Sequence, residues 1–183
     1  MAILRELGEI AVAFLALSFA FSYPDLLGNP SFLEIAMLAV GVGFVGHELM
    51  HRFVAKRFGY EAAFRIWPQG ILFAVGLAIL TNGAFIFAAP GAVVFGSRSG
   101  KYALGDVGKI GLAGPAFNLV LFGILTVLSV PFPMLGLAAR VNAWLALFNL
   151  IPFGPLDGQK VLAWSKPAWS VAVALAAIGV FVF

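Results

Sequence analysis

The stretch that decides the fold is residues 32–54, which read FLEIAMLAVGVGFVGHELMHRFV. A helix needs about 20 mostly apolar residues to cross the hydrocarbon core of a bilayer, and this stretch is long enough. Two histidines, a glutamate and an arginine interrupt its second half. Ionisable side chains inside a membrane-spanning helix are costly to bury and usually serve a function. The stretch therefore predicts a transmembrane helix that carries a functional site.

The composition of the chain also indicates a membrane protein. Hydrophobic residues make up 62% of the 183 residues and charged residues 10%, against about 45–50% and about 25% in soluble domains. This excludes a disordered chain and a soluble globular enzyme, and the length predicts one integral-membrane domain over residues 1–183. The chain has no cysteine, which excludes disulfides and thiolate metal sites. We interpret the net charge of +3 as an orientation signal, so the lipid bilayer is an expected partner and nucleic acid is not.

Further apolar stretches predict an all-α polytopic membrane protein with about five to six transmembrane helices. Another apolar run follows Leu7, and a last one extends from Ala168 to the C-terminus. The first run also has the form of a secretory signal peptide, but the acidic residues Glu6 and Glu9 favour a retained helix. The predicted core helices lie at about 32–54, 110–130 and 135–151.

Basic side chains predict the orientation in the cell membrane. Lys56, Arg57 and Arg65 follow the 32–54 stretch, whereas the loop after the first apolar run has no Lys or Arg. Because cytoplasmic loops are enriched in Lys and Arg, we expect the N-terminus and the functional site to face the cytoplasm.

The two histidines of the chain, His47 and His51, form an H-E-x-x-H pattern with Glu48. Residues four apart lie on one face of a helix, so both imidazoles can bind one metal ion. Glu48 would lie beside the open position of the metal, where it is suited to take a proton from water. One zinc ion per chain is expected from imidazole and carboxylate ligands in a hydrolytic site. The alternative is a structural role, in which these side chains join helices and Glu48 pairs with Arg52.

A catalytic zinc ion needs a third protein ligand. Because no histidine or cysteine remains, this ligand must be a carboxylate. Asp157 is favoured because Pro152 and Pro155 break the helix before it, and irregular backbone at membrane depth lines protein or a wet cavity. The alternative for Asp157 is a helix N-cap. The other carboxylates considered are Glu6, Glu9, Asp25, Glu34, Glu61 and Asp106.

A shared metal site constrains the middle of the chain. His47 lies about 10 Å from the inner end of its helix, and Asp157 must reach the same depth. The segment at about 71–95 must then cross the membrane an even number of times, with possible reversal points at Asn82–Gly83 and Pro90–Gly91. We expect a membrane-embedded re-entrant β-hairpin region between the second and third membrane-spanning segments. Its expected strands are residues 84–87 and 92–95.

Three motifs of the chain match the motifs of one protein family in their order and spacing. They are HELMH at 47–51, GPAFN at 114–118 and NLIPFGPLDG at 149–158. The last two are similar to the G-P-x-x-N and N-x-x-P-x-x-x-x-D-G motifs of the site-2 protease family of intramembrane zinc metalloproteases. The chain resembles the compact prokaryotic members of that family. The resemblance implies zinc ligands at His47, His51 and Asp157, and a catalytic base at Glu48.

The resemblance also implies roles for two asparagines. Asn149 is implied to contact the substrate backbone or the oxyanion, and so to act in both catalysis and substrate binding. Asn118 is implied to bind substrate. The alternative for each asparagine is an interhelical hydrogen bond.

The expected function is hydrolysis of peptide bonds within or near the transmembrane segments of membrane-protein substrates. One alternative is a membrane protein that binds or transports metal without hydrolysis. Glu48 argues against it, because a transporter needs no base beside the open metal position. A second alternative is a catalytically silent relative that binds membrane helices.

Overall fold

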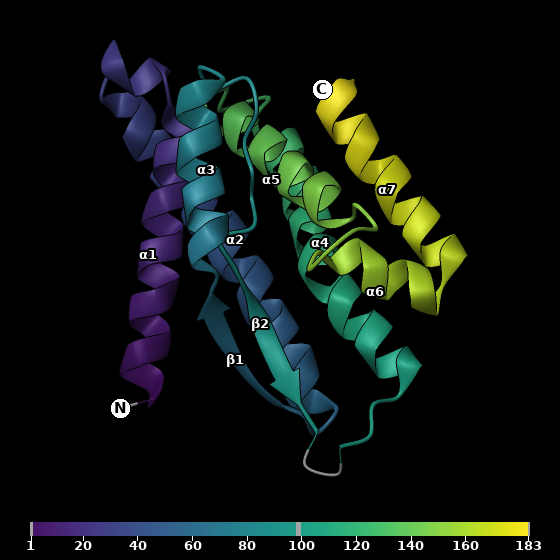
Figure 1. Ribbon diagram of the computed structural model, residues 1–183. Helices are drawn as coiled ribbons and strands as arrows, with labels where there is room; N and C mark the ends of the chain where they lie inside the picture. Colours follow the sequence, from purple (N-terminus) through teal and green to yellow (C-terminus); the bar gives the residue numbers. More distant parts are fainter. Residues whose placement is uncertain (1, 98–99, 183) are drawn as a thin grey trace.

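A computed structural model describes residues 2–97 and 100–182, and it is mostly helical (Figure 1). The helices are α1 (Ala2–Ser22), α2 (Ser31–Arg57), α3 (Pro68–Leu80), α4 (Leu104–Leu128), α5 (Leu135–Asn149), α6 (Asp157–Trp164) and α7 (Lys166–Phe181), with a short 3₁₀ turn, η1 (Asp25–Leu27). The strands are β1 (Glu61–Ile66) and β2 (Gly91–Gly96).

Helices α2, α4 and α5 pack against one another at the centre of the molecule. Helices α1 and α3 lie on one side of this centre with the sheet, and α6 and α7 lie on the other (Figure 1). Small residues allow the close approach of the central helices. A Cβ atom added at Gly43 would lie 2.7 Å from Oδ1 of Asn142, and one added at Gly46 would overlap the Phe117 ring.

The predicted core helices agree with α2, α4 and α5, but α4 begins earlier than expected. Its first turn contains Asp106, a charged residue that a search for apolar residues leaves out. An acidic residue is favourable there because the N-terminus of a helix carries partial positive charge. Helix α5 ends at Asn149, shortly before Pro152, which cannot continue a helix.

The expected pair of strands is partly wrong. Strand β2 overlaps the predicted strand at 92–95, but it pairs in antiparallel register with β1, and residues 84–87 contain no strand. The charged residues Glu61 and Arg65 made β1 resemble a polar loop in the sequence. Of the two predicted reversal points, Asn82–Gly83 forms a turn in which both residues have positive φ angles, 52° and 78°. Pro90–Gly91 leads directly into strand β2. From there the chain returns beside α3 to β2 (Figure 1).

The segment after the helix-breaking Pro152 and Pro155 contains the short helix α6. The bend before it brings the α6 N-terminus against the end of α5. A Cβ atom added at Gly158 would overlap the Leu150 carbonyl oxygen and lie 2.6 Å from that of Ile151. The backbone in this bend therefore requires glycine at position 158, next to Asp157.

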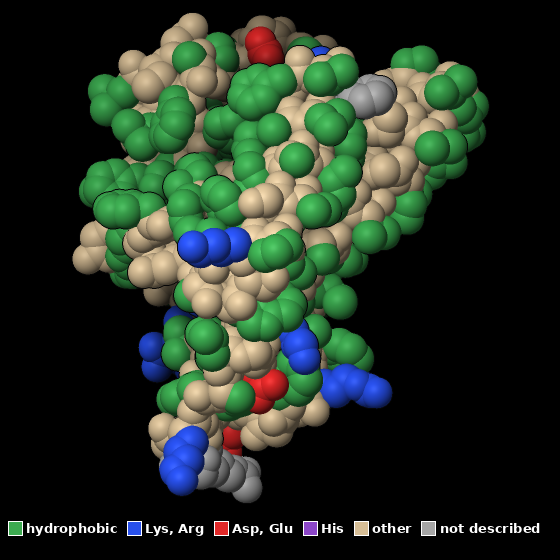
Figure 2. All heavy atoms as spheres, turned by 90° about the vertical axis from the view of Figure 1, so that its right-hand side faces the viewer, with side chains coloured by type: hydrophobic (Ala, Val, Ile, Leu, Met, Phe, Trp, Pro, Cys, Tyr) green, Lys and Arg blue, Asp and Glu red, His purple; other side chains and the backbone are tan. Residues whose placement is uncertain are grey.

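Among the described helices, α2 and α4 are long and apolar enough to cross a bilayer, by length and composition. Hydrophobic side chains cover much of the upper part of the face in Figure 2, and most of its visible Lys and Arg side chains lie toward the lower end. This distribution is consistent with a membrane protein.

Replacing Gly158 with alanine is expected to destabilise the fold by about 1–3 kcal/mol, because the new methyl group has no space beside the backbone of residues 150–151. Gly123→Ala in α4 is the matched control, since a Cβ atom there would meet nothing within 4 Å. Thermal unfolding of the detergent-purified variants measures the difference. Equal melting temperatures for the two variants would contradict this packing.

Candidate metal centre

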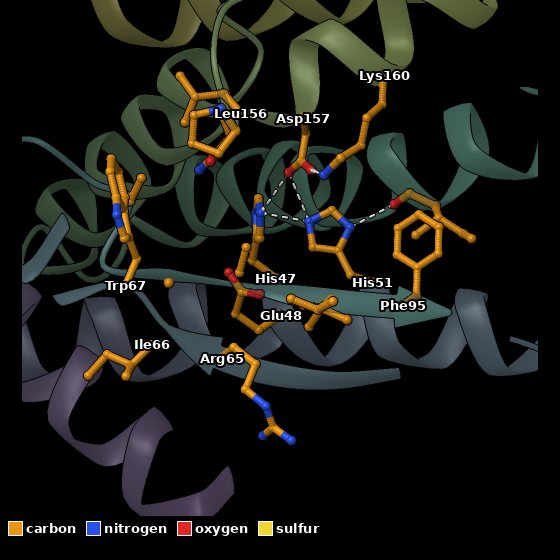
Figure 3. A pocket seen from close by; sticks show the side chains of 18 residues that line it. His47, Glu48, His51, Arg65, Ile66, Trp67, Phe95, Leu156, Asp157 and Lys160 are labelled. Carbon is orange, nitrogen blue, oxygen red and sulfur yellow. Dashed lines mark hydrogen bonds and ion pairs between the residues drawn. The ribbon is translucent and has the colours of Figure 1, made fainter. Parts of the chain in front are cut away.

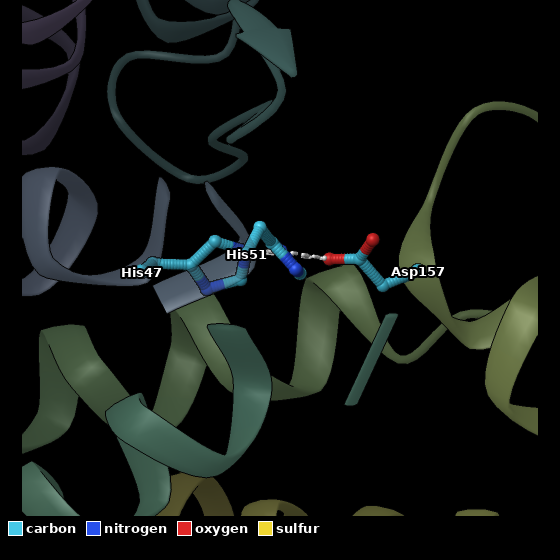
Figure 4. A group of neighbouring side chains, drawn as sticks. All are labelled: His47, His51 and Asp157. Carbon is cyan, nitrogen blue, oxygen red and sulfur yellow. Dashed lines mark hydrogen bonds and ion pairs between the residues drawn. The ribbon is translucent and has the colours of Figure 1, made fainter. Parts of the chain in front are cut away.

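Three side chains from α2 and α6 converge on one point. Nε2 of His47 lies 3.3 Å from Oδ2 of Asp157, and Nε2 of His51 lies 2.9 Å from the same oxygen (Figure 4). The two Nε2 atoms are 2.9 Å apart, and all three residues are buried. A tetrahedral zinc ion with bonds of about 2.0–2.1 Å holds neighbouring ligand atoms about 3.3 Å apart. The triangle is therefore close to the size that one zinc ion needs.

The hydrogen bonds of the two rings fix the positions of their protons. Nδ1 of His47 lies 2.6 Å from Oδ1 of Asn118, and Nδ1 of His51 lies 2.6 Å from the carbonyl oxygen of Ile110. Both oxygens accept, so each Nδ1 carries a proton and each Nε2 presents a lone pair. Two lone pairs and the Asp157 carboxylate then face one another. A cation between them satisfies all three, and the residues fit zinc.

Asn118 lies beneath the metal ligands and does not line the pocket. It is fully buried, and its Nδ2 donates to the Gly43 carbonyl oxygen at 3.0 Å and to Oδ1 of Asn142 at 2.9 Å. These two bonds orient the amide so that its oxygen accepts from His47. The geometry therefore favours the interhelical alternative for Asn118 over substrate contact, and it makes Asn118 a positioning residue. Sequence reasoning missed Asn142, whose signal was a polar amide in an apolar helix.

The glycines of α4 bring this helix close to the ligands. A Cβ atom added at Gly114 would overlap Nε2 of both His47 and His51. One added at Gly111 would lie 2.9 Å from Cβ of Lys160, one turn after Asp157. The G-P-x-x-N motif therefore has two structural effects, a close approach at Gly114 and a hydrogen bond that Asn118 accepts from His47.

Asp157 begins α6, and its side chain does not cap the helix. One carboxylate oxygen accepts from Nζ of Lys160 at 2.9 Å, and the other faces the two histidines. Figure 3 shows Asp157 and Lys160 facing the histidines from α6. The N-cap alternative is therefore wrong. Within the described part of the chain, no other candidate carboxylate belongs to this group.

Glu48 is buried beside the group but is not a member of it. The backbone N–H of Val93 in β2 interacts with its carboxylate. Oε2 of Glu48 has no hydrogen-bond partner among the described residues. A buried carboxylate oxygen without a partner is costly unless water or substrate binds it. Glu48 lines the pocket, so a water or substrate molecule that approached this oxygen would satisfy it.

The pocket that contains the ligands is also lined by residues of the sheet and of the α5–α6 bend (Figure 3). Asn149 lines it and donates from Nδ2 to the Leu145 carbonyl oxygen of its own helix at 2.9 Å. Strand β2 forms one wall, and Trp67 stands at one end. The pocket is therefore bounded by the metal group on one side and by a strand on another.

Several proteins from other organisms have similar sequences. "Putative zinc metalloprotease MJ0611" of Methanocaldococcus jannaschii is 38% identical over 98% of this chain and 94% of its own length. The chain belongs to this zinc metalloprotease family. "Putative zinc metalloprotease YwhC" of Bacillus subtilis is 29% identical over 72% of this metalloprotease and 69% of its own length. "Putative zinc metalloprotease sll0528" of Synechocystis is 31% identical over 76% of this metalloprotease and 34% of its own length.

No family profile and no solved structure matches this metalloprotease. The relatives' names and the buried His–His–Asp group agree on zinc as the cofactor.

Asn118→Leu is expected to weaken zinc binding by about 10–100-fold, because His47 loses the hydrogen bond that fixes its proton and ring orientation. Thr126→Val is the control, since Thr126 is on the same helix and bonds its own backbone. Competition with a chromophoric chelator measures both affinities. Wild-type affinity in Asn118→Leu would show that the amide does not hold the ligand.

Proposed function

We propose that this metalloprotease hydrolyses peptide bonds within or near transmembrane segments of membrane proteins, as site-2 proteases do. The observation that carries the proposal is a buried metal-ligand group and a buried glutamate on α2, a helix long and apolar enough to cross a bilayer. A soluble substrate would not require the site at this depth in an apolar helix. The catalytic centre is expected to lie within the cell membrane.

The proposed topology has five to six membrane-spanning helices and a re-entrant region. Helices α2 and α4 have the required length, and the shorter apolar helices α3 and α7 add to them. The positive-inside rule supports a cytoplasmic end for α2, because Arg52, Lys56 and Arg57 lie there. The return of the chain beside α3 supports an even number of crossings (Figure 1).

The proposed chemistry is hydrolysis assisted by a glutamate. When bound, zinc supplies a Lewis acid that acidifies water and polarises a peptide carbonyl. Glu48 takes the proton from the attacking water and then donates it to the leaving nitrogen of the cleaved peptide bond. Lys160 binds one oxygen of Asp157, and the other oxygen faces the two histidines, where it would help to hold the zinc ion.

Asn149 is the proposed second catalytic group. One of its two amide hydrogens bonds the Leu145 carbonyl oxygen, and the other is available to the pocket. A hydrogen bond from that amide would stabilise the oxyanion that forms at the attacked carbonyl. The same contact would help to bind the substrate backbone.

Strand β2 is the proposed support for the substrate. A peptide bond in a helix is hydrogen-bonded and shielded, so the substrate must be extended when it is cleaved. An extended peptide can add to the edge of a sheet through main-chain hydrogen bonds. The interaction of the Val93 N–H with Glu48 indicates that the edge of β2 faces the proposed base.

Glu48→Gln is expected to keep zinc and to lose at least about 100-fold in cleavage rate, because glutamine cannot accept the proton. The probe is a reporter protein whose single transmembrane segment contains a glycine pair, reconstituted with the enzyme in liposomes. Glu34→Gln, an exposed position on the same helix, is the control and should cleave as the wild type does. Equal cleavage by Glu48→Gln would remove Glu48 as the base. Zinc-loaded wild type that leaves the reporter intact would favour the metal-binding or transport alternative.

A further inference from the structure

The acidic residues at the start of α1 bind the backbone of β1. The N–H of Phe64 donates to Oε1 of Glu6 at 3.0 Å, and the N–H of Ile66 donates to Oε2 of Glu9 at 3.1 Å. These N–H groups point away from β2, because alternate residues of an antiparallel strand bond on opposite sides. Helix α1 lies along this outer side of β1 (Figure 1). The outer edge of β1 is therefore occupied by carboxylates.

Two arginines donate hydrogen bonds to backbone carbonyl groups on the same edge of β1. Nε of Arg52 donates to the Ala62 carbonyl oxygen at 3.4 Å, and Nη1 of Arg65 donates to that of Phe64 at 2.9 Å. The outward backbone groups from the Ala62 carbonyl to the Ile66 N–H thus have charged partners. We call this set of side chains the edge clamp: Glu6, Glu9, Arg52 and Arg65.

The spacing of the clamp matches the strand. Glu6 and Glu9 are three residues apart on one face of α1, a rise of about 4.5 Å. The outward N–H groups of Phe64 and Ile66 are about 6.6 Å apart along the strand, a difference that two flexible side chains span. Glu6 is buried, and its second oxygen lies 3.2 Å from Nη2 of Arg52. Both oxygens of this buried carboxylate therefore have partners, as its burial requires.

The clamp also connects the sheet to the metal helix. Arg52 follows the zinc ligand His51 directly on α2, and it contacts both Glu6 of α1 and the backbone of β1. One side chain thus links three elements at the level of the metal group.

The edge of β2 is different. No third strand pairs with β2 in the described part of the chain. Residues 91–95 of β2 line the pocket of the metal ligands, and the N–H of Val93 faces Glu48. An unpaired strand edge is a template for another strand, and proteins block unused edges with charged side chains. On the edge away from the metal, two N–H groups and two carbonyl groups have charged partners. On the edge that faces the metal, the charged contact is that of the Val93 N–H with the proposed base, Glu48.

We propose that the edge clamp makes the sheet one-sided: it closes β1 to strand pairing and holds β2 beside the metal centre, so that an extended apolar peptide docks on β2. This inference rests on the proposed function and specifies how its substrate is placed. Glu6 and Glu9 are positioning residues, because they contact β1 and act on the peptide through the sheet.

Disulfide capture of a peptide tests which edge is used, because the chain has no cysteine of its own. Ala63 of β1 and Val94 of β2 lie opposite each other in the register, and each is changed to cysteine in a zinc-loaded Glu48→Gln protein. The probe is a decapeptide of alternating valine and threonine with one central cysteine. A peptide strand docked on β2 would lie about 4.8 Å from β2 and about 9.6 Å from β1. A disulfide requires Cα atoms within about 7 Å, so we expect Val94→Cys to capture at least about tenfold more peptide than Ala63→Cys.

Removal of the clamp tests its role. In a Glu6→Ala/Glu9→Ala background, we expect capture at Val94→Cys to fall at least about fivefold, because a small displacement of the strand misplaces the peptide. Zinc content should remain at the wild-type level. Glu6→Gln/Glu9→Gln should restore most of the capture, since glutamine still accepts from the two N–H groups. Glu34→Ala is the control, because it removes an exposed acidic residue of α2 that is not part of the edge clamp.

Several results would overturn the inference. They are equal capture at the two edges, no capture at Val94→Cys, unchanged capture in the double alanine variant, and loss of zinc from that variant. Failure of the glutamine variant to restore capture would also overturn it, because hydrogen bonds to the two N–H groups of β1 would then not hold the strand. The proposed function fails separately, because reporter cleavage and its dependence on Glu48 are measured without the capture peptide.

Discussion

The structure depends on one constraint: the Nε2 atoms of His47 and His51 and a carboxylate oxygen of Asp157 converge with no proton between them. Both Nδ1 atoms of His47 and His51 already donate, so their Nε2 lone pairs and the Asp157 carboxylate face one another in a buried space. Such an arrangement is unfavourable without a cation and favourable with one. The absence of a side chain at Gly114 and the bend before α6 both follow from the need to bring these atoms together.

Buried carboxylates illustrate how partners set the role of a residue type. Asp157 has Lys160 on one oxygen and directs the other at the histidines. Glu6 has a backbone N–H on one oxygen and Arg52 on the other, so neither is available for chemistry. Glu48 has one oxygen without a protein partner, which suits proton transfer. The three acids therefore divide into a metal ligand, a structural clamp and a proposed base.

The sequence predicted the ligand group because its geometry is local or strongly constrained. His47 and His51 lie on the same face of a helix in any fold, and Asp157 was favoured by its helix-breaking neighbours. Strand β1 escaped prediction because its partner, β2, follows only after α3 and a reversal. The positioning role of Asn118 depends on Asn142 and Gly43, which lie on other helices. Contacts of that kind are set by packing and are not encoded in the spacing of one helix.

The most direct test of the metal centre is the zinc content per chain of detergent-purified protein, measured for the wild type and for Asp157→Ala. The measurement needs no substrate. A three-ligand site predicts about one zinc ion per wild-type chain and a clear loss in the variant, because two histidines alone leave the site one ligand short. Zinc at the wild-type level in Asp157→Ala, or none in a wild type supplied with zinc, would contradict it.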